Sequence, residues 1–306
     1  MARSCFYCGA SAVADDYGIP LWVPELTGLA DQPVEHMLAE EPPPRKPRGA
    51  ADQLPYSLPS HAELGEDQPV ARLHEAIDET ITEHSRLALA EYSARSLCAA
   101  CAKHLAELDA RARPLLEPMI EGSAREYDAA EQRLLAAWGA RAAYAALAVE
   151  RKSQGVPKSH RRALRERGEP HTNVFVGFGR YRANHIAVLA ARLIVPLGQE
   201  EATRDVEAYS VLSVFGHMAV KVFGITRKPV QTRVKPPEGQ MVRFWPAEHE
   251  RATWPPLWGL SEQTLDGAFT YTPFFRPFRY TEVRYLGPGK KYPAKRKRTE
   301  GLRGRQ

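Results

Sequence analysis

Hydrophobic positions along the chain change their spacing near residue 150. From residue 98 to 150 they recur at helical intervals, so that Leu135, Trp138 and Ala142 share one face of a predicted helix. After residue 172, short runs rich in Val, Ile and Phe follow one another, as in "NVFVGFG" and "AYSVLSVFGHMAVKVFG". Such runs are typical of strands. The pattern predicts helices in the first half and an antiparallel sheet in the second, which is an α+β fold.

Two stretches of the first half have a different character. Residues 27–70 include "AEEPPPRKPRGAADQLPYSLPS", whose prolines lack the backbone donor that helices and sheets require. We predict that they form a partly disordered, proline-rich insertion. Residues from about 70 to 97 then return to helical spacing, with apolar residues at every fourth position. A helix is expected there.

Composition bounds the class of protein. The length of 306 residues and the hydrophobic content of 43% suffice for a buried core, and we expect two domains. The beginning, "MARSCFYCG", lacks the apolar stretch of a secretory signal. A helix needs about 18 apolar residues to cross a membrane, and the sequence contains no such run. We therefore expect a cytoplasmic protein without membrane contact.

Four cysteines form two pairs with the spacing of metal-binding knuckles. Cys5 and Cys8, followed by Gly9, are the first Cys-x-x-Cys pair, and Cys98 and Cys101 are the second. Two thiolates three residues apart bind one tetrahedral ion from a single turn, and the glycine permits a positive φ beyond it. Two such pairs predict one structural zinc site with four thiolates. Two separate redox pairs or disulfides are the alternative, which a reducing compartment disfavours.

The predicted organisation follows from these patterns. A zinc-binding module with helices occupies residues 1–150 and contains the proline-rich insertion. A basic connector at 151–171 leads to an antiparallel β-rich domain at 172–286. The segment 287–306 is a disordered basic tail.

Basic charge is concentrated in two stretches. The net charge is +5, but the tail holds eight Lys and Arg residues against one Glu, which amounts to +7 and leaves the remainder at −2. The tail lacks apolar periodicity, so we expect it to be disordered and suited to contact phosphates. The second stretch, "RKSQGVPKSHRRALRERG", can form one basic face. The candidate nucleic-acid contacts are Lys158, Arg161, Arg162, Arg165, Lys290, Lys291, Lys295, Arg296, Lys297 and Arg298.

Several separated motifs resemble those of a family of bacterial and phage HNH-endonuclease-like proteins. The knuckle segments "CFYCGASAVADDYGIPLWV" and "LCAACAKHLAELDARARPLLEPMIEG" are similar to the beginning of that family. The segments "AAEQRLLAAWGARAAYA", "VPKSHRRAL" and "RFWPAEHERATWPPLWGL" follow in the same order. The likeness covers roughly residues 5–270, except for 27–97. It implies a zinc-stabilised ββα module of treble-clef type and, in an active enzyme, a catalytic divalent metal such as Mg²⁺.

The residues at the expected catalytic positions depart from the family pattern. Asp16 takes the acidic position, and Tyr17 takes the position of the histidine that activates water. A tyrosine, with an ordinary pKa near ~10, is a poor general base at neutral pH. Ala102 replaces the asparagine that holds the histidine loop in the family. We therefore predict that the zinc-supported structure is kept while cleavage is weakened or lost.

Other histidines and three tryptophans have residue types that occur in functional sites. His104 could bind a second metal together with Asp16. His36 belongs to an acid–histidine pair beside the proline-rich insertion. His217 lies in an apolar run and is interpreted as a packing residue. The same interpretation applies to three tryptophans near two proline motifs, Trp245, Trp254 and Trp258.

The sequence predicts a zinc-containing nucleic-acid-binding protein related to HNH endonucleases, with DNA as the expected partner. The first alternative is an active metal-dependent HNH endonuclease that uses Asp16 with His104 or His36. The second is a protein-interaction scaffold in which the zinc and tryptophan motifs only stabilise the fold. The candidate catalytic residues are Asp16, Tyr17 and His104.

Overall fold

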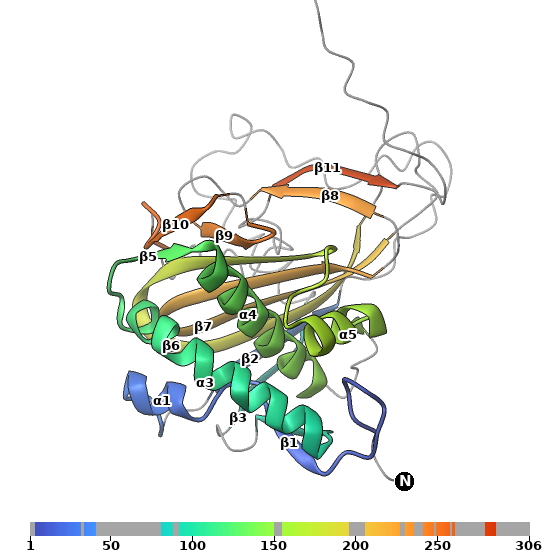
Figure 1. Cartoon of the computed structure of the whole chain (residues 1–306). Coiled ribbons are helices and arrows are strands. Elements are labelled where there is room, and N and C mark those ends of the chain that lie inside the picture. The colour runs from blue at the N-terminus through green and yellow to red at the C-terminus, as the bar shows by residue number, and fades with distance from the viewer. Residues whose placement is uncertain are drawn as a thin grey trace, which may run out of the picture.

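The computed structural model describes residues 4–31, 34–40, 81–87, 92–149, 155–195, 206–226, 230–235, 241–247, 249–257, 259–260 and 279–285. Within this part of the chain, four helices and several sheets form a mixed fold of α and β elements, as the spacing of apolar residues predicted (Figure 1). Helices α3, α4 and α5 pack across one face of the largest sheet (Figure 1). The helices are α1 (Trp22–Thr27), α3 (Ala99–Glu121), α4 (Ala129–Val149) and α5 (Lys158–Arg167).

The largest sheet has five strands and is built on two long neighbours, β6 and β7. Its strand order is β3-β2-β6-β7, and β9 pairs with β6 as well. Strand β2 runs parallel to β6, whereas the other pairs are antiparallel. The antiparallel sheet predicted for the second half is therefore a mixed one, because a strand from the first half joins it. The members are β2 (Val34–Glu40), β3 (Ile81–Leu87), β6 (Val174–Val195), β7 (Val206–Ile225) and β9 (Met241–Trp245).

Three two-stranded sheets complete the described strands. Strand β1 pairs with β4, β5 with β10, and β8 with β11, each in antiparallel register. The first of these pairs joins segments separated by the whole proline-rich stretch, and helix α3 follows β4 directly. Their bounds are β1 (Ala14–Tyr17), β4 (Ser93–Leu97), β5 (Arg125–Asp128), β8 (Val230–Lys235), β10 (Arg251–Trp254) and β11 (Arg279–Tyr285).

Helix α4 is the centre of the hydrophobic core. Every residue from 135 to 148 is buried, so the helix is covered on all sides and not only on the one face that its spacing predicted. Alanine is the commonest residue in this run, which keeps the helix narrow. Gly139 packs tightly against the sheet, because a Cβ there would be 3.0 Å from Val176 Cγ1 and 3.1 Å from Val220 Cγ2. A side chain at this position would require the two valines to give way by a few tenths of an ångström.

The start of α4 is fixed by a reciprocal capping box. Asp128 Oδ1 accepts hydrogen bonds from the backbone N–H of Ala130 at 2.8 Å and of Glu131 at 2.9 Å. Glu131 Oε2 in turn accepts from the Asp128 backbone N–H at 3.1 Å. These bonds satisfy backbone donors that have no partner inside the helix.

Two local predictions are wrong. Strand β2 lies in the segment expected to be loop, and strands β3 and β4 lie in the segment expected to be helical. In each case a partner from elsewhere in the chain supplies backbone hydrogen bonds, which outweigh the local pattern. The remainder of the insertion and the tail 287–306 lie outside the described residues.

A single cluster of buried side chains connects the helices with the sheets. It extends from Phe6 of the first knuckle, through Trp138 of α4, to Trp254 of β10. The side chains of Trp138 and Trp254 are fully buried. In the described part of the chain, no helix is both long and apolar enough to cross a membrane.

Candidate metal centre

The first knuckle is a tight turn that presents two sulfur atoms on the same side. The backbone N–H of Cys5 donates to the carbonyl of Ala10 at 2.5 Å, and that of Gly9 donates to the carbonyl of Cys5 at 2.9 Å. Gly9 has a φ of 82°, the left-handed conformation predicted from its place after the cysteine pair. The turn therefore closes directly behind Cys8.

The second knuckle forms the beginning of helix α3. Cys98 precedes the helix in an extended conformation, and its carbonyl accepts the backbone N–H of Ala102 at 2.9 Å. Cys101 lies in the first helical turn, so its side chain points back toward that of Cys98. Strand β4 leads directly into this turn and fixes its position.

Backbone bonds between β4 and the N-terminal segment bring the two knuckles together. The N–H of Phe6 donates to the Ser96 carbonyl at 2.7 Å, and the N–H of Val13 donates to the Leu97 carbonyl at 2.7 Å. These bonds continue the pairing of β1 with β4. Two motifs about ninety residues apart in sequence thus become neighbours.

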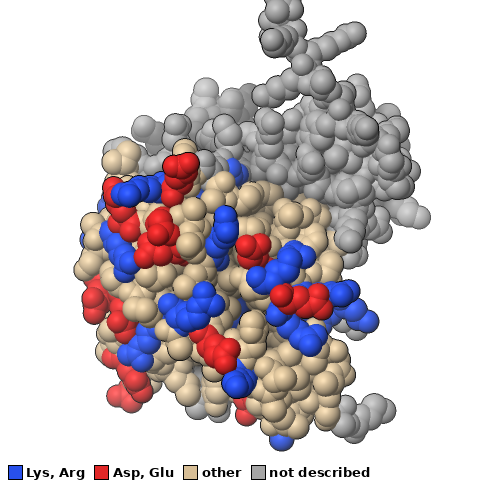
Figure 2. All heavy atoms as spheres, viewed as in Figure 1, with Lys and Arg blue, Asp and Glu red and all other residues tan. Residues whose placement is uncertain are grey.

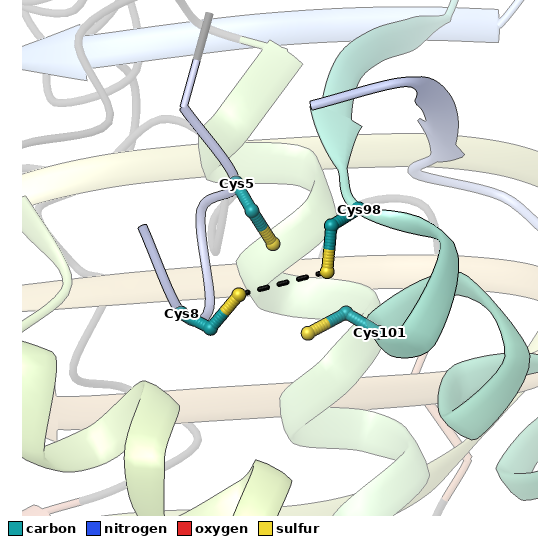
Figure 3. Close-up of side chains that lie close together, drawn as sticks. All are labelled: Cys5, Cys8, Cys98 and Cys101. Atoms are coloured by element: carbon teal, nitrogen blue, oxygen red, sulfur yellow. Dashed lines mark hydrogen bonds between the residues drawn. The ribbon is translucent and has the colours of Figure 1, made fainter. Parts of the chain in front are cut away.

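The four sulfur atoms converge on one point (Figure 3). All four Sγ atoms lie within 4.8 Å of one another, and Cys8 and Cys98 are separated by 3.6 Å. Tetrahedral zinc with Zn–S bonds of about 2.3 Å places its sulfur ligands roughly 3.8 Å apart. All four cysteines are free thiols. The donor set therefore fits a tetrahedral thiophilic metal such as zinc, and the single cluster disfavours two independent redox pairs.

The protonation of these thiols differs across the site. The backbone N–H of Cys101, at the start of α3, lowers the pKa of the Cys98 thiol to about 7. Burial raises the pKa of the Cys101 thiol. A divalent metal deprotonates the thiols that coordinate it. The positive charge of a bound metal would therefore stabilise the Cys101 thiolate, which burial alone disfavours.

Asp16, the predicted catalytic acid, lies in a buried ion cluster. Its side chain accepts a hydrogen bond from Arg141 Nη2 at 3.1 Å, and Asp109 Oδ2 lies 3.3 Å from the same nitrogen. Arg141 Nη1 donates to the backbone carbonyl of Tyr17 at 3.0 Å. The exposed fraction of Asp16 is 1% and that of Arg141 is 5%. We call Asp16, Asp109 and Arg141 the Arg141 cluster.

The cluster sets the pKa of its carboxyl groups. Burial raises the pKa of Asp16 to about 6, even though the Arg141 charge lowers it, and the charge of Asp109 adds to the increase. Burial likewise raises the pKa of Asp109 above its usual range, again against the effect of Arg141. Each carboxyl group is thus held by the arginine in surroundings that disfavour its charge.

The other predicted catalytic residues do not complete a metal site with Asp16. Within the described side chains, the cysteines are the one group of three or more His, Cys, Asp or Glu residues close enough to hold a metal. His104, on the first turns of α3, and Tyr17, at the end of β1, are both partly exposed. His36 belongs to β2, and its side chain lies outside the described part.

Helix α5 carries four predicted nucleic-acid contacts, and they divide into two groups. Lys158, Arg162 and Arg165 are exposed. Arg161 instead turns inward, donates to the backbone carbonyl of Phe6, and lies 4.5 Å from the centre of the Phe6 ring. Its prediction as a phosphate contact is therefore not supported by its position. Arg161 fastens α5 to the first knuckle.

The inner face of α5 is fixed by a second contact. His160 is buried, with its Nδ1 at 2.9 Å from the hydroxyl of Tyr209 in β7. That hydroxyl donates to the hydroxyl of Tyr144 in α4 at 3.2 Å. Helix α5 thus has a defined orientation relative to the knuckle, the sheet and the central helix.

The remaining histidine and tryptophan predictions concern packing. His217 is partly buried, with its Nδ1 at 3.2 Å from the Tyr181 carbonyl. Trp245 donates its indole N–H to the His171 carbonyl at 3.2 Å, and Trp254 is fully buried. Trp258 and the six predicted contacts of the tail lie outside the described residues.

Arg141 is the residue that the sequence pattern should have singled out. It is the only charged residue of the run "LLAAWGARAAYAALAV". A charge in a run that is buried on all sides requires a partner of opposite sign, because burial of an isolated charge is prohibitively costly. The pattern therefore predicts that Arg141 has an acidic partner, but it does not identify that residue.

No family profile, curated protein or solved structure gives a significant match to this chain.

Proposed function

We propose that the protein is a zinc-stabilised nucleic-acid-binding protein that cleaves its partner weakly or not at all. The observation that carries the proposal is the position of helix α5. Arg161 fastens this helix to the first knuckle, while Lys158, Arg162 and Arg165 point away from the core. The cysteine centre then acts as the rigid base of a basic helix.

Zinc has a structural part in this proposal. The four thiolates would fill all four positions of a tetrahedral ion, which leaves no open position for water or a substrate. Such closed sites stabilise a fold because the metal binds the folded arrangement of ligands and not the unfolded chain. The ion would hold the N-terminal segment against helix α3.

The exposed residues of α5 suit contact with phosphates. Lys158, Arg162 and Arg165 follow one another at intervals of four and three residues, so they form one row about 10 Å long on the helix. Arg162 bonds to Glu166 at 2.8 Å, but both side chains are exposed, and such pairs contribute little. A phosphate would displace the glutamate at small cost. Basic rows of this kind bind nucleic acids without regard to sequence.

The burial of Asp16 is the reason for proposing weak cleavage. A metal that hydrolyses a phosphodiester must contact both its protein ligands and the substrate. Asp16 is closed off from solvent and already bound to Arg141. Tyr17, beside it, is a poor base at neutral pH. Nevertheless, the order β1, β4 and α3 around four cysteines is an observation in favour of the proposed relation to HNH endonucleases.

Salt-dependent binding to DNA and RNA tests this proposal directly. Affinity of the full chain for random duplex DNA, single-stranded DNA and duplex RNA is measured by fluorescence anisotropy between low and moderate salt. Changing Lys158, Arg162 and Arg165 to Gln removes three exposed charges. If all three contact phosphates, the slope of log K against log[salt] on duplex DNA becomes shallower by about 2.7.

A matched variant separates a located contact from a general effect of charge. Lys103, Arg111 and Arg133 are also exposed but lie on α3 and α4, so changing them to Gln removes the same charge elsewhere. We expect this control to retain the wild-type slope. Equal losses in both variants would contradict a site on α5. Deletion of residues 287–306 measures the predicted contribution of the tail separately.

A protein-interaction scaffold is the second candidate, and one observation favours it. On the face shown in Figure 2, Lys and Arg are interspersed with Asp and Glu, including around helix α5. Mixed surfaces of this kind do not concentrate a strong positive field. The absence of binding to any of the three nucleic acids at low salt would therefore favour the scaffold.

A further inference from the structure

We propose that Cys8 and Cys98 form a site of oxidative modification, at which a hydroperoxide joins the two knuckles by a disulfide and expels the metal. Disulfide formation follows from the geometry of the thiols themselves. Metal expulsion rests on the zinc site proposed above.

The first argument is the distance between the two sulfur atoms. Cys8 Sγ and Cys98 Sγ are 3.6 Å apart, and they belong to different knuckles (Figure 3). A disulfide bond measures about 2.05 Å. The sulfurs must therefore approach by roughly 1.5 Å, a movement on the scale of side-chain rotation. The backbone bond from the Phe6 N–H to the Ser96 carbonyl already holds the first knuckle beside the residues that precede Cys98.

The second argument is access. Cys5 and Cys101 are 2% and 4% exposed, whereas Cys8 and Cys98 are both partly exposed. A small peroxide in solution thus reaches one cysteine of each knuckle and is excluded from the other. Oxidation of thiols follows their accessibility and thiolate character. The accessible partner of Cys8 is Cys98, and not the buried Cys5 of its own knuckle.

The chemistry balances with a hydroperoxide as the oxidant. The thiolate of one cysteine attacks the O–O bond, which breaks to give a sulfenic acid and release an alcohol, or water from hydrogen peroxide. The second thiolate attacks the sulfenic sulfur, forms the S–S bond and displaces hydroxide, which leaves as water. The two sulfurs together lose two electrons, and the peroxide gains them. A metal at the centre would lose two of its four ligands.

The oxidised protein would keep its knuckles together. The new bond would link residues ninety positions apart and replace the metal as the cross-link between the first knuckle and helix α3. Disulfides within each knuckle would have the opposite effect, since they would leave the two segments without a cross-link. The two outcomes therefore differ in the stability of the oxidised chain as well as in its bonds.

Peroxide titration of the full, zinc-loaded chain tests the proposal. Hydrogen peroxide is added, released zinc is followed with a chromogenic chelator, and the disulfides are mapped by mass spectrometry of unreduced peptides. We expect release of one zinc ion for each disulfide formed, with Cys8–Cys98 as the principal linkage. Treatment with a thiol reductant and zinc should restore the free thiols and the bound metal. Predominant Cys5–Cys8 or Cys98–Cys101 linkages, or thiols that survive excess peroxide, would overturn the proposal.

Two variants that retain four ligands sharpen the test. Cys8→His replaces one thiolate with an imidazole, which binds zinc but forms no disulfide. We expect loss of peroxide-driven zinc release in this variant. Ala102→Ser is the matched control, since it changes a residue beside the second knuckle but leaves all four cysteines in place, and it should release zinc like the wild type. Equal release from both variants would exclude the assigned pair.

Failure of the zinc site and failure of the modification can be told apart. Metal analysis of the untreated chain reports on zinc alone. If the chain binds no zinc, peptide mapping after peroxide still determines which cysteines are joined. If zinc is bound but Cys8 and Cys98 remain thiols, the modification fails and the metal site stands.

Discussion

The cysteine centre and the Arg141 cluster both connect the N-terminal segment to the helices, but they do so with different kinds of side chain. The cysteine centre joins the first knuckle to the start of helix α3 through four side chains from two short motifs. The Arg141 cluster joins β1, α3 and α4 through three single residues, of which Asp16 and Arg141 are 125 positions apart. The first connection depends on cysteine side chains, and the second depends on ion pairs between an arginine and two carboxyl groups.

The difference shows which kind of site can be recognised from residue spacing in a sequence. Tetrahedral ligation imposes a fixed spacing inside each cysteine pair, so each half of the centre is a local pattern. An ion cluster imposes no spacing on its members. The cluster is also the weaker support in principle, because removing charges from water costs about as much free energy as their attraction returns. The following predictions test this contrast.

Loss of a cysteine ligand should have the largest effect. Cys101→Ala removes a buried ligand, and apparent binding free energies of structural zinc in small domains are about 10–16 kcal/mol. We expect the variant to lose its metal and the N-terminal segment to unfold. Metal analysis and amide hydrogen exchange of residues 4–31 measure both. Ala102→Ser, at the next position, should behave like the wild type, and a wild-type chain with well under one zinc would refute the centre.

Disruption of the Arg141 cluster should have the second largest effect. Arg141→Met leaves two carboxyl groups without their arginine and should destabilise the chain by about 3–5 kcal/mol. Urea unfolding measures this loss. Arg133→Met, on an exposed position of the same helix, should change stability by less than about 0.5 kcal/mol.

A triple variant shows whether the charge of Arg141 or its packing is responsible for the lost stability. Combining Arg141→Met with Asp16→Asn and Asp109→Asn removes the uncompensated charges. We expect much of the lost stability to return. If the combined variant is as unstable as Arg141→Met alone, the arginine acts through its contacts and not through its charge.

The pH dependence of the cluster should be smaller and opposite in sign to that of the metal centre. The pKa of Asp16 is raised to about 6 from an ordinary value near 3.8, so the folded chain holds this proton more tightly than the unfolded chain. Its contribution to stability is therefore full below pH 3.8 and is lost as the pH rises to about 6. The loss is on the order of 3 kcal/mol. The metal centre instead loses zinc as falling pH protonates its ligands.

Subtraction isolates the contribution of the carboxyl group. The free energy of unfolding is measured for the wild type and for Asp16→Asn between pH 4 and 7, with zinc present in both. We expect the wild type to lose stability relative to the variant as the pH rises. Parallel curves would indicate that the carboxyl group titrates normally in the folded chain.

The smallest expected signal is DNA cleavage. With Mg²⁺, Mn²⁺ or Ni²⁺, the wild type should not nick supercoiled plasmid above background. A general base contributes about 10²–10⁴-fold to such reactions, and Tyr17 does not supply one. Tyr17→His together with Ala102→Asn is the variant in which activity would first return. Robust cleavage by the wild type that is abolished by Asp16→Ala would contradict the proposed function.

The helices after Cys98 and the four clustered cysteines could be predicted from the sequence, whereas the elements and contacts that depend on distant partners could not. The spacing of Cys5 and Cys8 predicts half of a metal site, and the apolar run around Trp138 predicts a helix. Both patterns lie within a short stretch of sequence. The sequence marks Asp16 as a candidate acid, but its contacts depend on Arg141, which no local spacing connects to it. Strand β2 was missed for the same reason, because its identity as a strand comes from pairing with β3 and β6.

The separation of the two knuckles along the chain has a consequence during synthesis. The first pair of thiols leaves the ribosome about ninety residues before the second pair. At typical elongation rates of 5–20 residues per second, the interval is roughly 5–18 s. For that time the nascent chain would carry half of the proposed zinc site, with its thiols open to solvent, to other metals and to oxidants. The time at which the four cysteines could bind one ion would then depend on the rate of synthesis as well as on the supply of zinc.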